Sequence, residues 1–182
     1  MIYSDLLHQA IIASVLAGNE ILKVYETNFD VEIKNDKSPV TLADKNASDK
    51  IIEFLKPFNI EVLSEEGKHE DYNVRKNWEK LWIVDPLDGT KEFVKRNGEF
   101  TVNIALVEYG MPTLGVIFSP VSNDLYFSSK NNGAFKISGN DFSLIKDSIE
   151  SSSLAFILTK AQKLPIKTIS HLDKKSNRKQ KD

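Results

Sequence analysis

The sequence predicts an α+β fold in which a pair of helices is layered on a mainly antiparallel sheet. Two observations predict it: apolar residues recur at helical spacing over residues 4–55, and short alternating runs follow over residues 60–137. Helices that precede a series of strands are typical of segregated layers rather than of alternating βαβ units. With 182 residues, 41% of them hydrophobic, the chain is long enough for one hydrophobic core and hardly for two.

The first predicted helix spans residues 4–25 and has small residues, Ala17 and Gly18, on its apolar side. Small residues there indicate that another element packs closely against the helix. A second helix is predicted over residues 42–55 and must end near Pro57, because proline lacks the amide hydrogen that a helix interior uses. Asp44 falls on the apolar face near the start of this helix, which marks it as a candidate functional carboxylate.

Short alternating or apolar runs predict the strands. A short strand over residues 31–34 precedes a turn, and the polar segment 68–80 is predicted to be a loop. The last four strands, separated by turn residues, are expected to form an antiparallel meander. The predicted strands of the main sheet cover residues 60–63, 81–84, 100–108, 113–118, 125–129 and 134–137.

The character of the sequence changes near residue 145. We expect an α+β domain over residues 1–145 and a divergent, basic, poorly ordered tail over residues 146–182, with no further helix or strand. Residues 160–182 carry a net charge of +6, and the other 159 residues carry −8. An acidic body repels nucleic-acid backbones, so no nucleic-acid partner is expected. The basic end is expected to be solvated rather than to bind RNA or anionic lipid.

The residue types exclude several kinds of chemistry. The absence of cysteine excludes disulfides, thiolate metal sites and cysteine nucleophiles, and three histidines disfavour a His-rich zinc site. Any metal must therefore be held mainly by oxygen. The N-terminus has no signal-peptide pattern, and no run of 18 apolar residues predicts a membrane-spanning helix, which is consistent with a cytoplasmic protein.

The run D-P-L-D-G-T at residues 85–90 is the strongest candidate functional segment. Asp85 directly follows a predicted strand, and the bend that Pro86 and Gly89 allow can bring Asp88 close to it. Two carboxylates at that distance repel each other unless a cation lies between them, and hard oxygen ligands favour Mg²⁺. The backbone amides of Gly89 and Thr90 and the Thr90 hydroxyl could then bind a phosphate oxygen.

Two other interpretations of this run compete with a metal site. Asp, Pro and Gly are common turn residues, so D-x-x-D-G alone is typical of a structural turn. The acidic pair Glu65-Glu66 after the preceding strand, together with Asp44, favours the functional interpretation. Haloacid-dehalogenase-type phosphatases carry D-x-D-G-T instead. The three-residue spacing here would put the two acids on opposite faces of an extended strand, which disfavours that class.

Several segments match one known family. They are V-T-L-A-D at residues 40–44, L-S-E-E-G at 63–67, W-I-V-D-P-L-D-G-T-K-E-F at 82–93 and G-E-F-T-V-N-I-A-L at 98–106. They resemble the inositol monophosphatase superfamily, and within it the 3′(2′),5′-bisphosphate nucleotidases, over residues 1–140. The resemblance implies the N-terminal part of that superfamily's αβαβα fold. It also implies Mg²⁺-dependent, two-metal hydrolysis of adenosine 3′,5′-bisphosphate to AMP and phosphate, with two or more ions and inhibition by Li⁺.

The same resemblance implies a role for each matching residue. Glu65 binds a Mg²⁺ ion and Asp85 bridges two of them. The Leu87 backbone carbonyl holds the first ion, and Asp88 holds the second. Asp44 and Thr90 orient and deprotonate the attacking water. The residues implied to bind substrate are Glu65, Leu87, Asp88, Gly89 and Thr90.

One motif of the superfamily is absent from the sequence. No Trp-Asp pair occurs, so the W-D-x-A-A-G aspartate that completes the second metal site is missing, and we expect a truncated or frameshifted product with little activity. An inositol or sugar monophosphatase and a non-catalytic remnant remain the alternatives. The resemblance implies a cytoplasmic protein, either free or associated peripherally with the cytoplasmic side of the inner membrane, and leaves its oligomeric state open.

Overall fold

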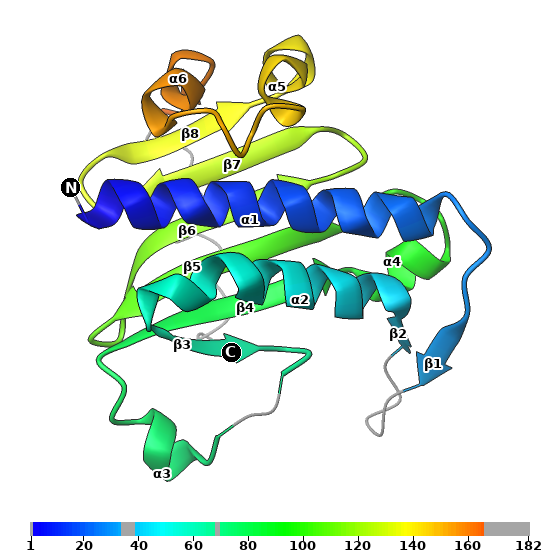
Figure 1. Ribbon diagram of the computed structural model, residues 1–182, viewed down its shortest axis with the longest axis horizontal. Helices are drawn as coiled ribbons and strands as arrows, with labels where there is room; N and C mark the ends of the chain where they lie inside the picture. The colour runs from blue at the N-terminus through cyan, green and yellow to red at the C-terminus, as the bar shows by residue number, and fades with distance from the viewer. Residues whose placement is uncertain (1, 34–38, 68–69, 166–182) are drawn as a thin grey trace, which may run out of the picture.

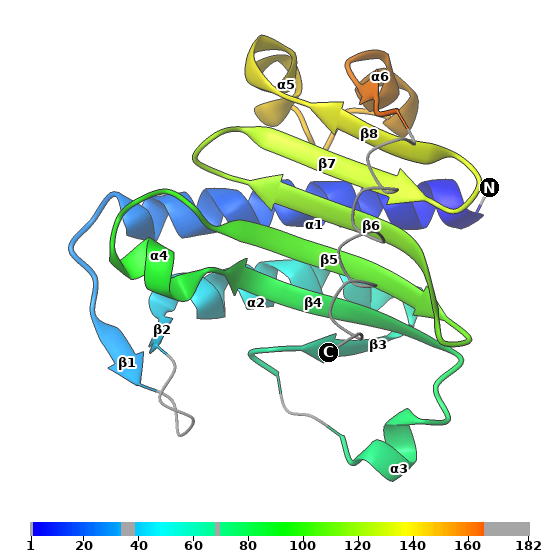
Figure 2. The same ribbon diagram turned by 180° about the vertical axis from the view of Figure 1, so that it is seen from behind.

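The structure, a computed structural model, describes residues 2–33, 39–67 and 70–165. Helices α1 (Ile2–Tyr25) and α2 (Leu42–Leu55) lie side by side on one face of a sheet (Figure 1). Seen from behind, the other face carries no helix from the described residues (Figure 2). The strands of this sheet, in spatial order, are β3 (Glu61–Ser64), β4 (Lys80–Asp88), β5 (Thr101–Glu108), β6 (Met111–Ser119), β7 (Asp124–Ser129), β8 (Gly133–Ile137) and β9 (Gln162–Lys163).

The sheet is antiparallel except at one pair. Strands β3 and β4 run parallel, with Ser64 opposite Val84, whereas every other neighbouring pair from β4 to β9 is antiparallel. A separate two-stranded hairpin, β1 (Val31–Ile33) with β2 (Pro39–Thr41), joins the two helices. The predicted α+β architecture, with a helix pair layered on a mainly antiparallel sheet, is therefore confirmed.

Helix α2 begins and ends where the sequence predicts. Thr41 caps its N-terminus: the Thr41 hydroxyl accepts a hydrogen bond from the Ala43 amide at 3.1 Å, and Asp44 completes a capping box. Its C-terminus passes into a short 3₁₀ turn at Lys56–Phe58, where Pro57 fits because the amides of a first turn need no helical acceptor. The cap places the Asp44 side chain in the interior, where it is 1% exposed.

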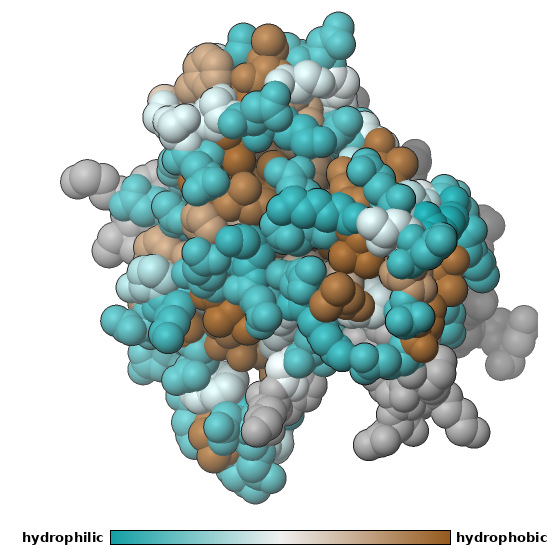
Figure 3. All heavy atoms as spheres, turned by 45° about the vertical axis from the view of Figure 1, so that its right-hand side comes forward, coloured by the Kyte–Doolittle hydropathy of each residue, from teal (hydrophilic) through white to brown (hydrophobic). Residues whose placement is uncertain are grey.

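Alternation along the strands separates the two faces of the sheet. On β5, Val102, Ile104 and Leu106 are buried in the same core as the apolar face of α1, while the residues between them are only half-buried. The fully buried Trp82 of β4 belongs to that core. With the view of Figure 1 turned by 45°, the visible surface is mostly hydrophilic, with hydrophobic groups between the hydrophilic residues (Figure 3).

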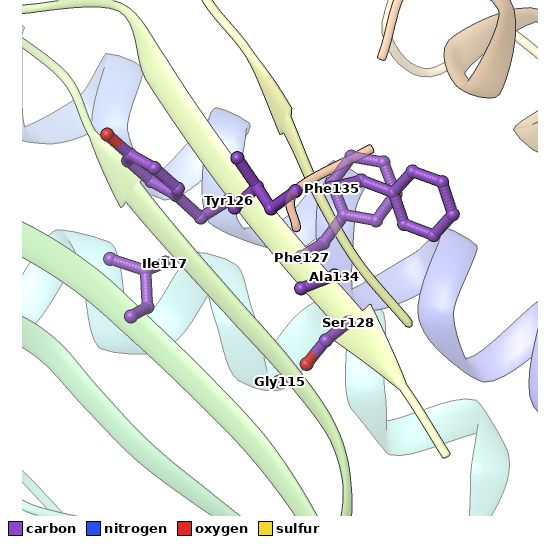
Figure 4. Close-up of a pocket in the computed structure, with 8 residues that line it drawn as sticks. Gly115, Ile117, Tyr126, Phe127, Ser128, Ala134 and Phe135 are labelled. Carbon is purple, nitrogen blue, oxygen red and sulfur yellow. The ribbon is translucent and has the colours of Figure 1, made fainter. Parts of the chain in front are cut away.

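The opposite face of the sheet is partly apolar. Ile83 and Ile117 are 44% and 46% exposed. Between β6, β7 and β8 lies a pocket of about 140 Å³, to which Ile117 and Tyr126 contribute from neighbouring strands (Figure 4). This pocket contains none of the predicted site residues. Among the described residues, no helix has both the length and the apolarity that crossing a bilayer requires.

Regular structure continues past residue 145, contrary to expectation. Helix α5 (Gly139–Lys146) is followed by α6 (Leu154–Thr159), and β9 pairs with β8 at the edge of the sheet. Helix α6 could not be predicted because its six residues are too few to show helical periodicity. Its helical state instead follows from burial of Ile157 and from the Ser153 cap. Division of the chain at residue 145 stays a prediction, and the expected disorder over 166–182 lies outside the described residues.

The predicted loop over residues 68–80 also contains a short helix, α3 (Tyr72–Arg75). Residues 68–69 lie outside the described residues. The Asp71 side chain caps α3 by accepting a hydrogen bond from the Asn73 amide at 2.8 Å. Four polar or exposed residues leave no apolar pattern, so this turn of helix could not be predicted from periodicity.

Close packing of α1 on β6 gives a first test. A Cβ atom at Gly18 would lie 2.4 Å from a ring carbon of the buried Phe118, as expected for a small residue on this face. Gly18→Ala should therefore lower the free energy of unfolding by about 1–3 kcal/mol through overpacking, which outweighs a gain of about 1 kcal/mol in helix propensity. Urea unfolding followed by circular dichroism measures the difference.

Asn19→Ala on the same helix is the matched control, because it raises helix propensity where the side chain is only half-buried. It should leave stability unchanged or raise it slightly. A Gly18→Ala protein as stable as the Asn19→Ala protein would show that the helix-sheet contact is looser than described.

Candidate active site

The parallel pairing of β3 and β4 brings two acidic residues together. Ser64 lies opposite Val84, so the residues that follow, Glu65 and Asp85, emerge at the same end of the two strands. The Glu65 amide donates a hydrogen bond to the Val84 carbonyl at 3.1 Å, which extends the ladder by one step. The sequence indicated only that acidic residues follow the two strands, and the structure shows that Glu65 and Asp85 are neighbours.

The run at residues 85–90 bends later than predicted. The sequence predicted a strand that ends at Val84, directly before Asp85, but β4 continues to Asp88, which lies opposite Thr101. Between them Pro86 and Leu87 face a single residue of β5, which is a β-bulge. Proline cannot donate to the ladder, so pairing is interrupted there and resumes at Asp88.

Asp85 lies in an electrostatically unfavourable position. Its Oδ1 atom is buried and has no hydrogen-bond partner among the described residues. Burial, followed by repulsion from Glu65 and Asp88, raises the pKa of the Asp85 carboxyl from 3.8 to about 7. A buried carboxylate oxygen without a donor, next to two further acids, is expected where a cation normally supplies the missing charge.

These residues fit a divalent cation held by oxygen. The predicted ligands are the side chains of Glu65, Asp85 and Asp88 and the Leu87 backbone carbonyl. No cluster of three or more Asp, Glu, His or Cys side chains suited to a metal exists within residues 2–33, 39–67 and 70–165. The unpartnered Asp85 oxygen is what favours a cation here, and the individual ligand assignments stay predictions.

Asp44 is held by two threonines. Its Oδ2 atom accepts hydrogen bonds from the Thr41 amide and the Thr41 hydroxyl, both at 2.7 Å. Its Oδ1 atom accepts a hydrogen bond from the Thr90 hydroxyl at 3.1 Å. Burial raises the pKa of Asp44, while the bonds from Thr41 and Thr90 act in the opposite direction. Asp44 thus has a structural role as a cap, and its second oxygen couples α2 to the 85–90 run.

Gly89 turns the chain from β4 into the short helix α4 (Thr90–Val94). It adopts a left-handed conformation with φ of 94°, and a Cβ atom there would lie 2.9 Å from the Glu99 carbonyl oxygen. Only glycine satisfies both conditions. The turn brings the Thr90 hydroxyl within 3.1 Å of both the Leu87 carbonyl and Asp44. The structure thus gathers Asp44, Glu65, Asp85, Leu87, Asp88, Gly89 and Thr90 around one end of β4.

Sequence reasoning missed Asn103. This residue of β5 lies opposite Asp85, and its side-chain amide donates a hydrogen bond to Oδ2 of Asp88 at 2.9 Å. The Thr101 hydroxyl in turn donates to the Asn103 side-chain oxygen at 3.2 Å, which fixes the orientation of the amide. The available signal was a polar residue inside an apolar strand. Its partner could not be found without the register of β4 and β5.

Comparison with known proteins places this geometry in a family. The model of the inositol monophosphatase family matches residues 3–181, nearly the whole chain. The chain belongs to the inositol monophosphatase family. The family match runs past residue 140, where the recognised motifs end, and includes α5 and α6. Family membership and the α+β fold predicted from the motifs are both confirmed.

Two kinds of relatives lie within the family. The 3′(2′),5′-bisphosphate nucleotidase CysQ of Escherichia coli K12 is 49% identical over 118 residues, 63% of this chain and 48% of that protein. The crystal structure of CysQ from Bacteroides thetaiotaomicron is 44% identical with a TM-score of 0.75, covering 90% of this chain and 59% of that one. A structure titled IMPase/NADP phosphatase complexed with Mg²⁺ and phosphate is 25% identical, with a TM-score of 0.57, covering 65% of this chain and 45% of that one. The chain spans about half the length of the curated relatives it matches.

The crowding of acids around Asp85 gives a second test. In the metal-free protein the folded state holds a proton on Asp85, with pKa about 7, that the unfolded state releases near 3.8. Stability should therefore fall as the pH rises through this window. Asp85→Asn removes the repulsion and should raise the free energy of unfolding by roughly 1 kcal/mol, and by more at about pH 8 than at about pH 5.

Urea unfolding in a chelator at the two pH values measures this effect. Asp71→Asn, in the exposed cap of α3, is the control for loss of one negative charge elsewhere. A stability difference between Asp85→Asn and the wild type that is the same at both pH values would contradict the raised pKa.

Asn103 gives a third test. Asn103→Ala removes the hydrogen bond that orients the Asp88 carboxylate. If Asp88 holds Mg²⁺ as predicted, this change should weaken Mg²⁺ binding by about 10- to 100-fold, as loss of a residue that orients a ligand does. Isothermal titration calorimetry measures the affinity. Asn77→Ala, in the loop before β4, is a matched control and should bind Mg²⁺ like the wild type. Equal affinity in the Asn103→Ala protein would show that Asn103 does not orient a ligand.

Proposed function

We propose that this chain carries the metal- and phosphate-binding part of a Mg²⁺-dependent phosphomonoesterase acting on adenosine 3′,5′-bisphosphate. One observation carries the proposal: the buried, unpartnered Asp85 oxygen lies among acids beside a threonine hydroxyl that is bonded to a buried aspartate. The first part of this arrangement favours binding of a cation, and the second can orient a water molecule. Hydrolysis of a phosphate ester uses both.

The residues proposed to hold Mg²⁺ are Glu65, Asp85, Asp88 and the Leu87 carbonyl. When bound there, Mg²⁺ supplies Lewis-acid activation of water and neutralises charge on the phosphate oxygens. The backbone amides of Gly89 and Thr90 would donate to the phosphate at the start of α4. Glu65, Leu87 and Asp88 are the other residues proposed to contact the substrate.

The Thr90–Asp44 pair is proposed to handle the proton of the attacking water. The Thr90 hydroxyl donates to Asp44 at 3.1 Å, so its own oxygen lone pairs are left to accept a hydrogen bond from water. The Thr41 bonds keep Asp44 in place, and burial raises its pKa, which makes it a stronger base than an exposed aspartate. As one water proton passes through Thr90 to Asp44, the water oxygen forms a bond to phosphorus and the ester bond to the nucleotide 3′-oxygen breaks. The released 3′-oxygen takes up a proton from solvent, which gives AMP and phosphate.

The substrate assignment comes from the relatives. The matched proteins named 3′(2′),5′-bisphosphate nucleotidase support a phosphorylated nucleotide, which would leave as AMP together with phosphate. The structure titled as a complex with Mg²⁺ and phosphate supports the choice of ion. Inhibition by Li⁺ and a cytoplasmic location are part of the same proposal. An inositol or sugar monophosphatase and a catalytically inactive Mg²⁺-binding chain are the alternatives, because the chain spans only half the length of these relatives.

Phosphate release by the 182-residue protein tests the proposal. With Mg²⁺ it should release phosphate from adenosine 3′,5′-bisphosphate faster than from inositol 1-phosphate, and a chelator should stop the reaction. Asp85→Asn should reduce kcat by about 10²-fold or more while circular dichroism shows an intact fold, because a positioned cation contributes several kcal/mol to catalysis. Ser128→Ala, on β7 and away from the site, should retain the wild-type rate.

Each contrary result points to one alternative. Preference for inositol 1-phosphate would favour the inositol monophosphatase activity. Mg²⁺ binding without phosphate release would favour the inactive chain. Turnover retained by the Asp85→Asn protein would refute the role of Asp85 in holding the cation.

A further inference from the structure

Arg96 joins two segments that are far apart in the sequence. It follows α4, and its guanidinium donates hydrogen bonds to the Tyr25 carbonyl, at the last residue of α1, and to the Thr27 carbonyl just beyond. The last carbonyls of a helix have no partner within the helix and carry partial negative charge, so a cation that donates two bonds stabilises this end. Figures 1 and 2 both show α4 next to the C-terminal end of α1.

The same guanidinium covers an aromatic cluster. Its carbon lies 4.8 Å from the ring centre of Phe29 and 5.5 Å from that of Tyr25. Both rings pack on Phe93 of α4, with centroid distances of 4.7 Å and 5.1 Å. Phe93 is fully buried, so the cluster anchors the middle of α4.

Arg96 keeps this position despite an unfavourable backbone. Its φ is 58°, the left-handed conformation that glycine or asparagine usually adopts after a helix. An arginine in this conformation has a higher conformational free energy than glycine or asparagine would have, and the backbone itself does not require an arginine. The contacts of its side chain account for the residue.

Helix α4 has only five residues and cannot hold its position alone. Its first residue, Thr90, is tied to Asp44, and the segment after its last residue is tied to the end of α1 through Arg96. Beyond Thr27 the chain enters the β1–β2 hairpin, which ends at Thr41, the residue that holds Asp44. Arg96 therefore ties α4, which carries Thr90, to the segment after α1. That segment leads through the β1–β2 hairpin to Asp44.

We infer that Arg96 is a positioning residue for the Thr90–Asp44 pair, acting by holding α4 against the C-terminal end of α1. This inference rests on the proposed function, because the pair is assigned there to the attacking water. Arg96 need not touch substrate. Loss of its two hydrogen bonds should loosen α4 and move the Thr90 hydroxyl relative to Asp44, and a shift of about 1 Å in a catalytic group can lower a rate by about 10²-fold.

Three variants of the full chain test the inference. Arg96→Asn removes the side-chain contacts but suits the left-handed backbone, and Arg96→Lys keeps the charge but cannot donate the same pair of bonds. Lys95→Asn removes the neighbouring cation, which forms only an exposed ion pair with Glu92 at 3.4 Å. Hydrogen exchange followed by mass spectrometry on the metal-free protein is the first measurement, and kcat with KM for phosphate release is the second.

In the Arg96→Asn protein, amides of residues 90–97 should exchange roughly tenfold faster while those of α2 and β7 are unchanged, the factor expected from losing charge-assisted hydrogen bonds. Its kcat should fall about 10- to 100-fold with KM within about twofold. Arg96→Lys should lie between it and the wild type, and Lys95→Asn should match the wild type.

The inference is overturned if Arg96→Asn leaves exchange at residues 90–97 unchanged. It is also overturned if exchange accelerates equally in α2 and β7, which would indicate a general loss of stability, or if kcat is unchanged in an active protein. A wild-type chain that releases no phosphate would refute the proposed function instead. The exchange data would still decide whether Arg96 positions α4.

Discussion

Three carboxylates crowded at one end of β3 and β4 impose the main physical constraint on this molecule. Burial raises the pKa of the Asp85 carboxyl, and repulsion from Glu65 and Asp88 raises it further. Such an arrangement lowers the stability of the metal-free fold, so the surrounding structure must hold it in place. The parallel pairing of β3 with β4 and the bulge at Pro86 and Leu87 hold the three acids together, because strand register fixes their backbone positions relative to one another.

The helix layer supports the site from the other side of the sheet. Core residues of α1 and α2 share one cluster with Trp82 and Val84 of β4, so the strand that carries Asp85 is held by packing on the face opposite the carboxylate. The capping box at the start of α2 has two functions at once. It satisfies backbone donors of the helix, and it holds Asp44 so that one carboxylate oxygen faces Thr90. A structural interaction and a proposed catalytic one therefore depend on the same side chain.

The sequence was informative where a signal is local. The bounds of α2 follow from a threonine cap and Pro57, and the meander from alternation and turn residues. It was less informative where a residue's role depends on a distant partner. Asn103 could not be singled out because its role depends on the strand register that places it beside Asp88, and Arg96 could not because its role depends on contacts with Tyr25 and Thr27.

By itself, the sequence determined the layered α+β fold, the family and the residues that gather around Asp85, because these depend on periodicity and on motifs with fixed spacing. Tertiary structure decided where the strand that carries Asp85 ends, which oxygen of Asp44 accepts the hydrogen bond from Thr90 and how α4 is held in place. These depend on strand register and on contacts between residues up to 71 positions apart. Local sequence patterns contain no information about such pairings, because the helix or strand propensity of a residue is the same whichever distant residue it contacts.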